Sequence, residues 1–304
     1  MAYELRATLT TDIFPEFVLF SNGSIWVGTT TAVWRIDPVA LTVALIYVGA
    51  CRTNLVEDQY GYIWFMDVPA DLLRIDPSTN SITTFTVVSG QNTHNRLSLA
   101  LGELWVTVTN PPNSVDVYRV DPSTGVATYS FTTTGISGSI TGANSFFVEQ
   151  NGYIWFSRTG FAGHFVGQLD PATNTVVSNT LVNASVAYFH AGIAAYGYLW
   201  ATSNNGMIRF NTSSLAFAYD GGSSIKALVD YNGSLYSSDL SNVYKYDVNT
   251  LTTTTIIASV PVAIGDFRFD NAKNVFVAGI IGGGGRTLKY VIPAVGWVRG
   301  HAWG

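Results

Sequence analysis

The chain has 304 residues and a net charge of −5, with 47% of its residues hydrophobic and 12% charged. Because no basic stripe is present to neutralise phosphates, and the lysines are few and scattered, nucleic acid and anionic membrane surfaces are excluded as partners. Cys51 is the single cysteine, which excludes an internal disulfide and a thiolate metal site.

The first residues, MAYELRATLTTD, lack the basic region followed by an apolar region that marks a signal peptide. No apolar run in the chain reaches the ~18 residues of a membrane span. We therefore expect synthesis in the cytoplasm and no insertion into a membrane. The first predicted strand covers residues 3–9, and a second strand follows within the segment FPEFVLF at 14–20.

Seven copies of one unit follow, and each copy is keyed to one aromatic residue. The aromatic anchors lie 36 to 50 residues apart, and four short strands with their turns need ~40–50 residues, the length of a propeller blade. We therefore predict an all-β fold, a single seven-bladed β-propeller of four-stranded antiparallel blades that occupies residues 1–304 as one domain. The anchors are Trp26, Trp64, Trp105, Trp155, Trp200, Tyr236 and Phe276.

The second copy illustrates how each blade is predicted to be built. Apolar and polar residues alternate along its strands, and Gly61 supplies the positive φ that its first hairpin turn requires. In chain order, the predicted elements are an inner strand at 54–58, a turn at 59–61, a second strand at 62–66, a loop at 67–71, a third strand at 72–75, a turn at 76–80 and an outer strand at 81–87.

An acidic residue or asparagine recurs at the turn before the outer strand in six of the seven copies. Proline after the aspartate presets φ, and the carboxylate accepts N–H groups from the residues that follow, so we predict structural turns and not metal ligands. The anchor tryptophans are likewise predicted to pack between blades. The turns begin with Asp37-Pro38, Asp76-Pro77, Asp121-Pro122, Asp170-Pro171, Asn211-Thr212 and Asp247-Val248.

The end of the chain raises the question of how the ring closes. The four glycines at 282–285 lack the Lys-Ser/Thr pair of a phosphate-binding loop, so they predict a flexible hairpin loop. The strand at 3–9 precedes an inner strand, as outer strands do between copies, and we predict that it supplies the outer strand of the last blade. The competing candidate is the segment 296–300. Closure by either segment removes long open sheet edges.

The units Gly-x-(Ile/Leu)-Trp-(Phe/Val) and Arg-(Ile/Val)-Asp-Pro-x-Thr resemble those of the virginiamycin B lyase-like and NHL-like propellers over almost the whole chain. For the lyase, this resemblance implies a ring-opening elimination with Mg²⁺ and with His and Glu residues at the mouth of the central channel. His190 is the one match to the family's histidine position, and no glutamate occupies the family's glutamate position. That position reads Gly28-Thr29, Asp67, Thr107, Ser157, Thr202, Ser238-Asp239 and Ala278.

Polar residues gather where the inner strands are predicted to begin, at one mouth of the channel. A ligand is expected at this mouth because the polar groups converge there. No catalytic set, metal site or cofactor is predicted. If the protein is an enzyme, His190 acts with Asp266 or Asp67 and a divalent ion, Mg²⁺ in the lyase alternative. The candidate binding residues are Arg52, Asn54, His94, Arg96, Asn144, His190, Lys226 and Arg268.

Together these features favour a non-enzymatic binding or structural module, a rigid platform that engages a protein or a surface glycan through its loops and faces. The low charge, the scarcity of lysine and the lack of a signal peptide fit a virion-associated protein of a bacteriophage, in the tail or capsid, with other virion proteins as partners. Two alternatives stay open. One is a channel-mouth lyase or lactone hydrolase, and the other is a cytosolic scaffold or sensor propeller with a peptide partner.

Overall fold

The computed structural model of the chain describes an all-β protein. The described residues are 4–10, 15–51, 53–67, 71–87, 94–110, 114–133, 147–160, 163–183, 189–203, 206–221, 227–250, 252–281 and 284–291. Within these ranges every regular element is a strand, and no helix is long and apolar enough to cross a membrane.

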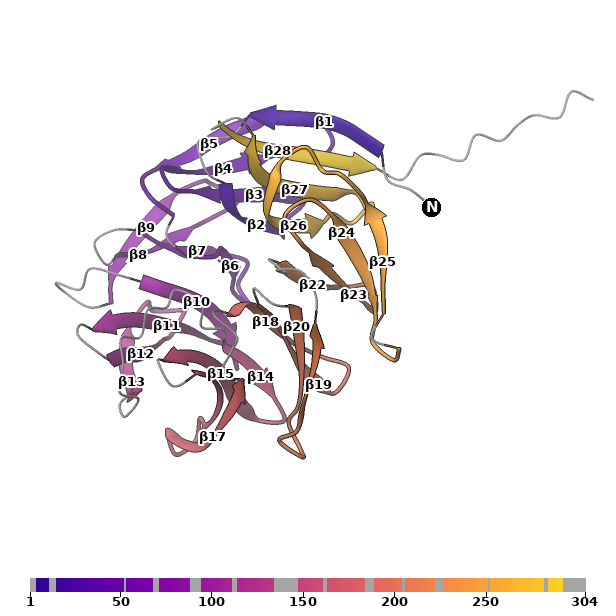
Figure 1. The fold of residues 1–304 in the computed structure, drawn as a ribbon. Helices are drawn as coiled ribbons and strands as arrows, with labels where there is room; N and C mark the ends of the chain where they lie inside the picture. Colours follow the sequence, from indigo (N-terminus) through magenta and orange to yellow (C-terminus); the bar gives the residue numbers. More distant parts are fainter. Residues whose placement is uncertain are drawn as a thin grey trace, which may run out of the picture.

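Seven four-stranded antiparallel sheets form a ring, which confirms the predicted seven-bladed β-propeller (Figure 1). Blade 1 consists of β2 (Pro15–Ser21), β3 (Ser24–Thr29), β4 (Ala32–Ile36) and β5 (Val43–Val48). Blade 2 consists of β6 (Val56–Glu57), β7 (Ile63–Met66), β8 (Asp71–Ile75) and β9 (Ile82–Thr86). Blade 3 consists of β10 (His94–Ala100), β11 (Glu103–Asn110), β12 (Ser114–Val120) and β13 (Ala127–Thr133). Blade 4 consists of β14 (Phe147–Gln150), β15 (Tyr153–Gly160), β16 (Gly163–Asp170) and β17 (Thr175–Asn183).

The remaining three blades follow the same order from the inner to the outer strand. Blade 5 consists of β18 (Phe189–Ala195), β19 (Tyr198–Ser203), β20 (Gly206–Asn211) and β21 (Phe217–Gly221). Blade 6 consists of β22 (Ala227–Tyr231), β23 (Ser234–Ser238), β24 (Val243–Asp247) and β25 (Thr252–Ile257). Blade 7 consists of β26 (Ala263–Phe269), β27 (Val275–Ile281), β28 (Gly284–Val291) and β1 (Glu4–Thr10).

The N-terminal strand closes the ring, as predicted for residues 3–9. In blade 7, β1 pairs antiparallel with β28, from Glu4 opposite Val291 to Thr10 opposite Arg286. The outer position of the blade is therefore filled by the start of the chain, with β1 lying along β28 at the top of Figure 1. The competing candidate, 296–300, lies outside the described residues.

The hydrophobic core is divided among the junctions between blades. Each of the seven buried clusters contains residues from two consecutive blades, including the junction of blade 7 with blade 1. Each anchor aromatic of blades 1 to 5 and 7 is fully or almost fully buried in the cluster toward the next blade, whereas Tyr236 is partly buried. The prediction that the repeated tryptophans pack between blades is therefore confirmed.

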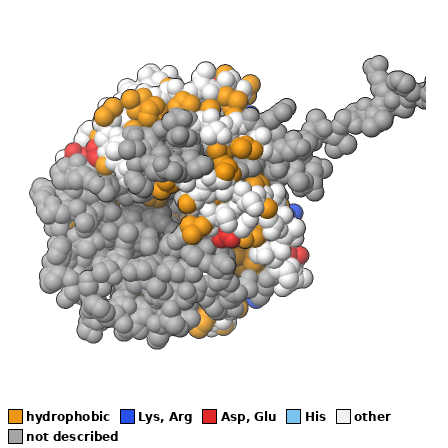
Figure 2. All heavy atoms as spheres, turned by 45° about the horizontal axis from the view of Figure 1, so that its top comes forward, with side chains coloured by type: hydrophobic (Ala, Val, Ile, Leu, Met, Phe, Trp, Pro, Cys, Tyr) orange, Lys and Arg blue, Asp and Glu red, His pale blue; other side chains and the backbone are white. Residues whose placement is uncertain are grey.

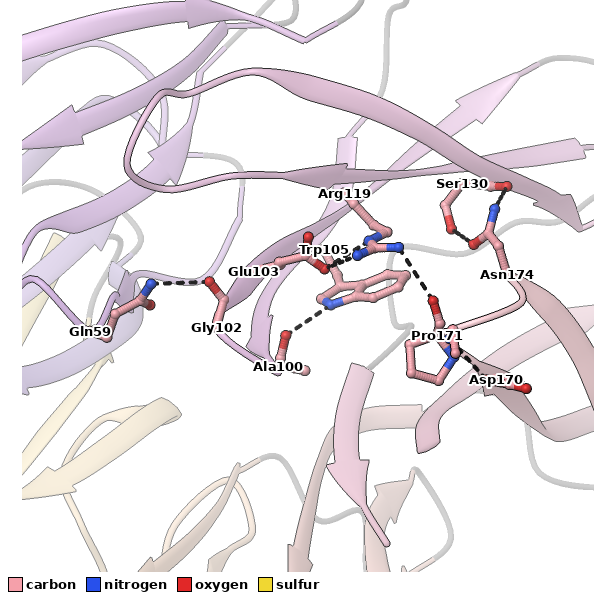
Figure 3. Close-up of polar contacts among 11 residues, drawn as sticks. Gln59, Ala100, Gly102, Glu103, Trp105, Arg119, Ser130, Asp170, Pro171 and Asn174 are labelled. Atoms are coloured by element: carbon pink, nitrogen blue, oxygen red, sulfur yellow. Dashed lines mark hydrogen bonds and ion pairs between the residues drawn. The ribbon is translucent and has the colours of Figure 1, made fainter. Parts of the chain in front are cut away.

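A basic residue on the third strand connects each of several blades to the next one. In blade 3, the Arg119 guanidinium lies 5.5 Å from the Trp105 ring, forms an ion pair with Glu103 at 2.6 Å and donates a hydrogen bond of 3.5 Å to the Pro171 carbonyl of blade 4 (Figure 3). The Asp-Pro turn therefore accepts a hydrogen bond from the preceding blade, a role that its local sequence does not reveal. Equivalent bonds join Arg35 to Pro77, Arg74 to Pro122 and Lys289 to Pro38.

One predicted strand is shorter in the structure than expected. Residues 54–58 were expected to form the inner strand of blade 2, but β6 covers Val56–Glu57 alone. A side chain replaces the backbone pairing with β7 at its start, since Thr53 Oγ1 accepts the Met66 N–H at 3.1 Å, while Asn54 Oδ1 accepts the Leu97 N–H of blade 3 at 3.3 Å. The sequence pattern of alternating residues cannot distinguish these side-chain bonds from a continued ladder.

The predicted aspartate turns form as local hydrogen-bonded units. Asp121 Oδ1 accepts the Ser123 hydroxyl at 2.7 Å and the Ser123 N–H at 2.8 Å, and Asp121 Oδ2 accepts the Thr124 hydroxyl at 3.0 Å. These bonds stabilise the charged carboxylate, and they hold the pKa of Asp121 below its usual value of 3.8. In blade 5, Asn211 Oδ1 accepts the N–H groups of the two corresponding turn residues, each at 2.9 Å.

The Asp121 turn predicts a specific dependence of stability on acid. Because the folded-state pKa lies below the unfolded value of about 3.8, the contribution of Asp121 is present above that pH and is lost as the pH falls through the folded pKa. Asp121→Asn keeps an acceptor, as Asn211 shows, but removes the titration. We expect the wild type to lose more of its urea-unfolding free energy than Asp121→Asn between pH 5 and about pH 3. A difference between the two proteins that does not change with pH would contradict this prediction.

Candidate functional site

The antiparallel order of each blade places its connections on two opposite rims of the ring. Turns between the first and second strands, and between the third and fourth strands, lie on one rim, which we call the turn rim. Loops between the second and third strands, and crossings from one blade to the next, lie on the other rim, which we call the connection rim. The channel mouth predicted from the sequence belongs to the connection rim.

The structure places some of the sequence candidates at the starts of inner strands. His94 begins β10 and His190 is the second residue of β18, whereas Asp266 is the middle residue of β26. Arg268 lies further along β26, opposite Phe276 and closer to the turn rim than expected. Of the other candidates, Asn54 and Asp67 flank β6 and β7 of blade 2 and Arg96 is in β10, whereas Arg52, Asn144, Lys226 and the side chains of His94, Arg96 and His190 lie outside the described part.

A shift of register recurs where these inner strands begin. In blade 5, Phe189 pairs with Ser203 and Ala191 pairs with Thr202, so His190 is the extra residue. The same shift occurs at Asn95 in blade 3. Glu16 in blade 1 and Gly265 in blade 7 are also extra residues. A β-bulge changes the direction of a strand and of its side chains. The side chains at the start of these inner strands therefore depart from the regular alternation of the rest of the strand.

Asp266 ties blade 7 to blade 1. Its side chain is buried, with 8% of the residue exposed. Asp266 Oδ2 accepts the Val18 N–H at 3.0 Å, while Oδ1 accepts the Phe267 N–H at 2.8 Å and Arg268 Nη1 at 2.6 Å. Both carboxylate oxygens are therefore used inside the protein. Asn54 has the matching role between blades 2 and 3, since Leu97 occupies the same register position as Val18.

Asp67 and Asp239 occupy the same position after the second strand in blades 2 and 6. Each accepts a tyrosine hydroxyl, Asp67 from Tyr47 and Asp239 from Tyr244, the latter at 2.5 Å. Burial and the bond to Asp67 raise the pKa of Tyr47, and burial and the bond to Asp239 raise the pKa of Tyr244 to about 12. Both phenols therefore stay protonated at neutral pH and act as donors that fix the carboxylates.

The two described acidic candidates, Asp266 and Asp67, are not bonded to each other or to a common neighbour. Asp266 belongs to blade 7 and Asp67 to blade 2, and each is bonded to a different set of neighbours. Among the residues that the structure describes, no group of three or more His, Cys, Asp or Glu side chains is placed to hold a metal ion.

Grooves on the turn rim offer a different surface. One of about 450 Å³ lies between blades 1 and 2 and contains Arg35 and Tyr60. Another, of about 370 Å³, lies between blades 5 and 6 and contains Tyr196 and Lys245. A third, of about 490 Å³, lies in blade 3 and contains Arg119. These volumes are within the range of small-molecule sites.

The residues of these grooves were not predicted from the sequence. Tyr60 belongs to the repeated Tyr-Gly-Tyr at 60–62, which was assigned only as a hairpin turn, and it is 58% exposed. Arg35 belongs to the Arg-Ile-Asp-Pro motif, which carried only the resemblance to known propellers. The signal that identifies Tyr60 is a large aromatic residue at a turn tip, where packing does not require one.

Comparisons with known proteins support the fold. No protein-family model matches the chain, and no curated protein matches it. Among solved structures, the WD40 β-propeller domain of Doa1 superposes with a TM-score of 0.71 at 13% identity, over 96% of this chain and 97% of that one. The extracellular domain of a one-component system from B. thetaiotaomicron superposes with a TM-score of 0.68 at 15% identity, over 94% of this chain.

A second B. thetaiotaomicron structure, the extracellular domain of a hybrid two-component system, superposes with a TM-score of 0.69 at 14% identity, over 91% of this chain. The chain covers 41% and 40% of these two bacterial structures, so it spans about two fifths of their length. At these identities the similarity establishes a β-propeller and leaves function to the site.

Proposed function

We propose that this β-propeller is a non-enzymatic binding or structural module, with protein partners and without nucleic acid or an inserted membrane segment. The observation that carries the proposal is that the carboxylates of the two acidic candidates are engaged in structural hydrogen bonds. Asp266 and Asp67 direct their carboxylates to hydrogen bonds that hold strands and loops together. A general acid or base needs a lone pair or proton within reach of a substrate, whereas a rigid ring with fixed rims suits recognition.

We place this module in a bacteriophage virion, in the tail or capsid, with other virion proteins as partners. The argument is the surface chemistry. The described part of the face shown in Figure 2 is mainly uncharged, with hydrophobic side chains among polar ones. Outer strands such as β5 expose Leu45 and Val48, and its sequence, VALIYV, contains no charged residue. Charged residues commonly protect edge strands from pairing with other chains, so an uncharged edge suits permanent assembly.

The test is the copy number of the chain in purified particles. Particles from a culture that produces the chain are separated on a density gradient and quantified by mass spectrometry against a major structural protein. We expect a constant ratio between preparations, with an abundant host protein as the control for contamination. Recovery only in the particle-free fraction would overturn the virion assignment, and free chain in the cytosol would favour a scaffold or sensor propeller.

A channel-mouth lyase or lactone hydrolase is the second candidate function. The observation that favours it is the register shift at His190, because bulges are frequent beside active sites. This candidate predicts turnover of a cyclic lactone with added Mg²⁺ and its loss in His190→Ala. Turnover that is unchanged in His190→Ala, or none in the wild type, excludes it.

A further inference from the structure

The groove between blades 1 and 2 combines a fixed cation with an exposed aromatic ring. It is lined by Asn22, Arg35, Tyr60, Gly61, Tyr62, Asp76, Pro77 and Ser78, and its volume is about 450 Å³. Blade 1 supplies the first two of these residues and blade 2 supplies the rest. The groove therefore exists only because two blades meet.

Arg35 is held in one orientation. Its Nε donates to Ser24 Oγ at 2.9 Å, and its Nη1 donates to the Pro77 carbonyl at 2.9 Å and to Asn80 Oδ1 at 3.2 Å. The guanidinium also lies 5.3 Å from the Trp26 ring. A guanidinium has five N–H donors, and these bonds use three. The two on Nη2 have no hydrogen-bond partner among the described residues, so a ligand that binds them meets a donor that is already ordered.

Tyr60 is exposed but stands on a rigid turn. Its N–H donates to Asp58 Oδ1 at 2.9 Å, and Gly61 N–H donates to the Asp58 carbonyl at 3.1 Å. Asn22 Nδ2 reaches from blade 1 to the Gly61 carbonyl at 3.1 Å. These bonds hold the backbone of the turn from both blades, and the turn presents the exposed phenol ring at the edge of the groove. A tyrosine ring offers an apolar face with partial negative charge, to which polarised C–H groups are attracted.

The charges in the groove select against ions. Arg35 carries a positive charge and Asp76 a negative one, and Asp76 Oδ1 accepts two bonds from Ser78, at 2.8 and 2.7 Å. A phosphate would face the Asp76 carboxylate, and an ammonium ion would face the Arg35 guanidinium. A neutral ligand with many hydroxyl groups and one apolar face satisfies donors, acceptors and the ring together.

We propose that this groove binds a neutral saccharide, with one sugar face stacked on Tyr60 and hydroxyl groups bonded to Arg35 Nη2 and Asn22 Oδ1. This inference rests on the proposed function, because it names the ligand class of a binding module. It assigns the ligand to the turn rim and not to the channel mouth. A peptide or an anion is the competing occupant, and the test separates them.

The experiment is saturation-transfer NMR with the full chain. The probes are neutral hexoses, N-acetylhexosamines and their disaccharides at millimolar concentration, with inorganic phosphate and a short neutral peptide in parallel titrations. We expect at least one saccharide to bind the wild type and to bind Tyr60→Ala about tenfold more weakly. Because Tyr60 is exposed, its removal leaves folding unchanged, which a thermal melt verifies.

Tyr196→Ala is the matched control, since Tyr196 has the same position in the Tyr-Gly-Tyr of blade 5. We expect it to bind saccharide as the wild type does. Binding of no saccharide probe, equal loss in the two variants, or binding of phosphate or peptide in preference to saccharide would overturn the proposal. Particle association of Tyr60→Ala is measured separately, so loss of the saccharide site and failure of the virion assignment give different results.

Discussion

Deletion of residues 1–10 is expected to lower the apparent melting temperature of the protein by about 10 °C or more. The deletion removes β1, the outer strand of blade 7, and with it the ladder from Glu4–Val291 to Thr10–Arg286. It also removes Leu9 from the cluster that joins blade 7 to blade 1. This cluster is the junction that connects the two ends of the repeat, so the deletion weakens the closure of the ring.

The size of the effect follows from cooperativity. Each blade buries its faces against two neighbours, so a ring without closure leaves one junction weakened and one strand edge exposed. A loss of roughly 4 kcal/mol, the range of the most disruptive single changes, corresponds to a shift of about 10 °C at 2–4 °C per kcal/mol. The exposed edge of β28 is also expected to pair with a second chain, giving dimers in size-exclusion chromatography.

The control is a truncation after residue 291, which removes the competing candidate for closure at 296–300. We expect this truncation to leave the melting temperature within about 2 °C of the wild type, because β1 already fills the outer position of blade 7. A larger loss from the C-terminal truncation than from the N-terminal one would show that β1 is not the strand that closes the ring.

The architecture was predictable because its determinants are local and repeated. An aromatic residue after a hairpin turn recurs at Trp26, Trp64 and their counterparts, and such periodicity directly encodes the number of blades. The closing strand was also predictable, because residues 3–9 precede an inner strand in the same order in which an outer strand precedes the inner strand of the next copy. Both signals need only residues that are close in sequence.

The site was less predictable because its contacts cross between blades. The Arg-Ile-Asp-Pro motif suggests that Arg35 serves its own turn, but Arg35 bonds to Pro77 of the next blade, 42 positions away. Asp266 is 248 positions from its partner Val18. The position of a polar residue along its own blade therefore does not show whether its polar atoms face a ligand or a strand of the next blade.

Trp64→Phe is expected to lower the free energy of unfolding by about 3 kcal/mol, clearly more than Trp105→Phe, for which we expect about 1–1.5 kcal/mol. Both indoles are fully buried, and both substitutions remove similar volume. They differ in the acceptor that loses its donor. Trp64 Nε1 donates to Asp58 Oδ2 at 2.6 Å, whereas Trp105 Nε1 donates to the Ala100 carbonyl at 3.1 Å.

The charge on the acceptor decides the difference between the two variants. Asp58 is 4% exposed, so Trp64→Phe leaves a buried carboxylate oxygen without its donor, and a hydrogen bond to a charged group contributes roughly 1.5–3 kcal/mol against about 1 for a neutral pair. Asp58→Asn in the Trp64→Phe background removes the charge, so it is expected to recover part of the loss. Urea unfolding followed by circular dichroism measures all three variants without relying on the altered tryptophans. Equal losses in Trp64→Phe and Trp105→Phe would mean that the volume of the indole, and not its N–H, determines how strongly these blades hold together.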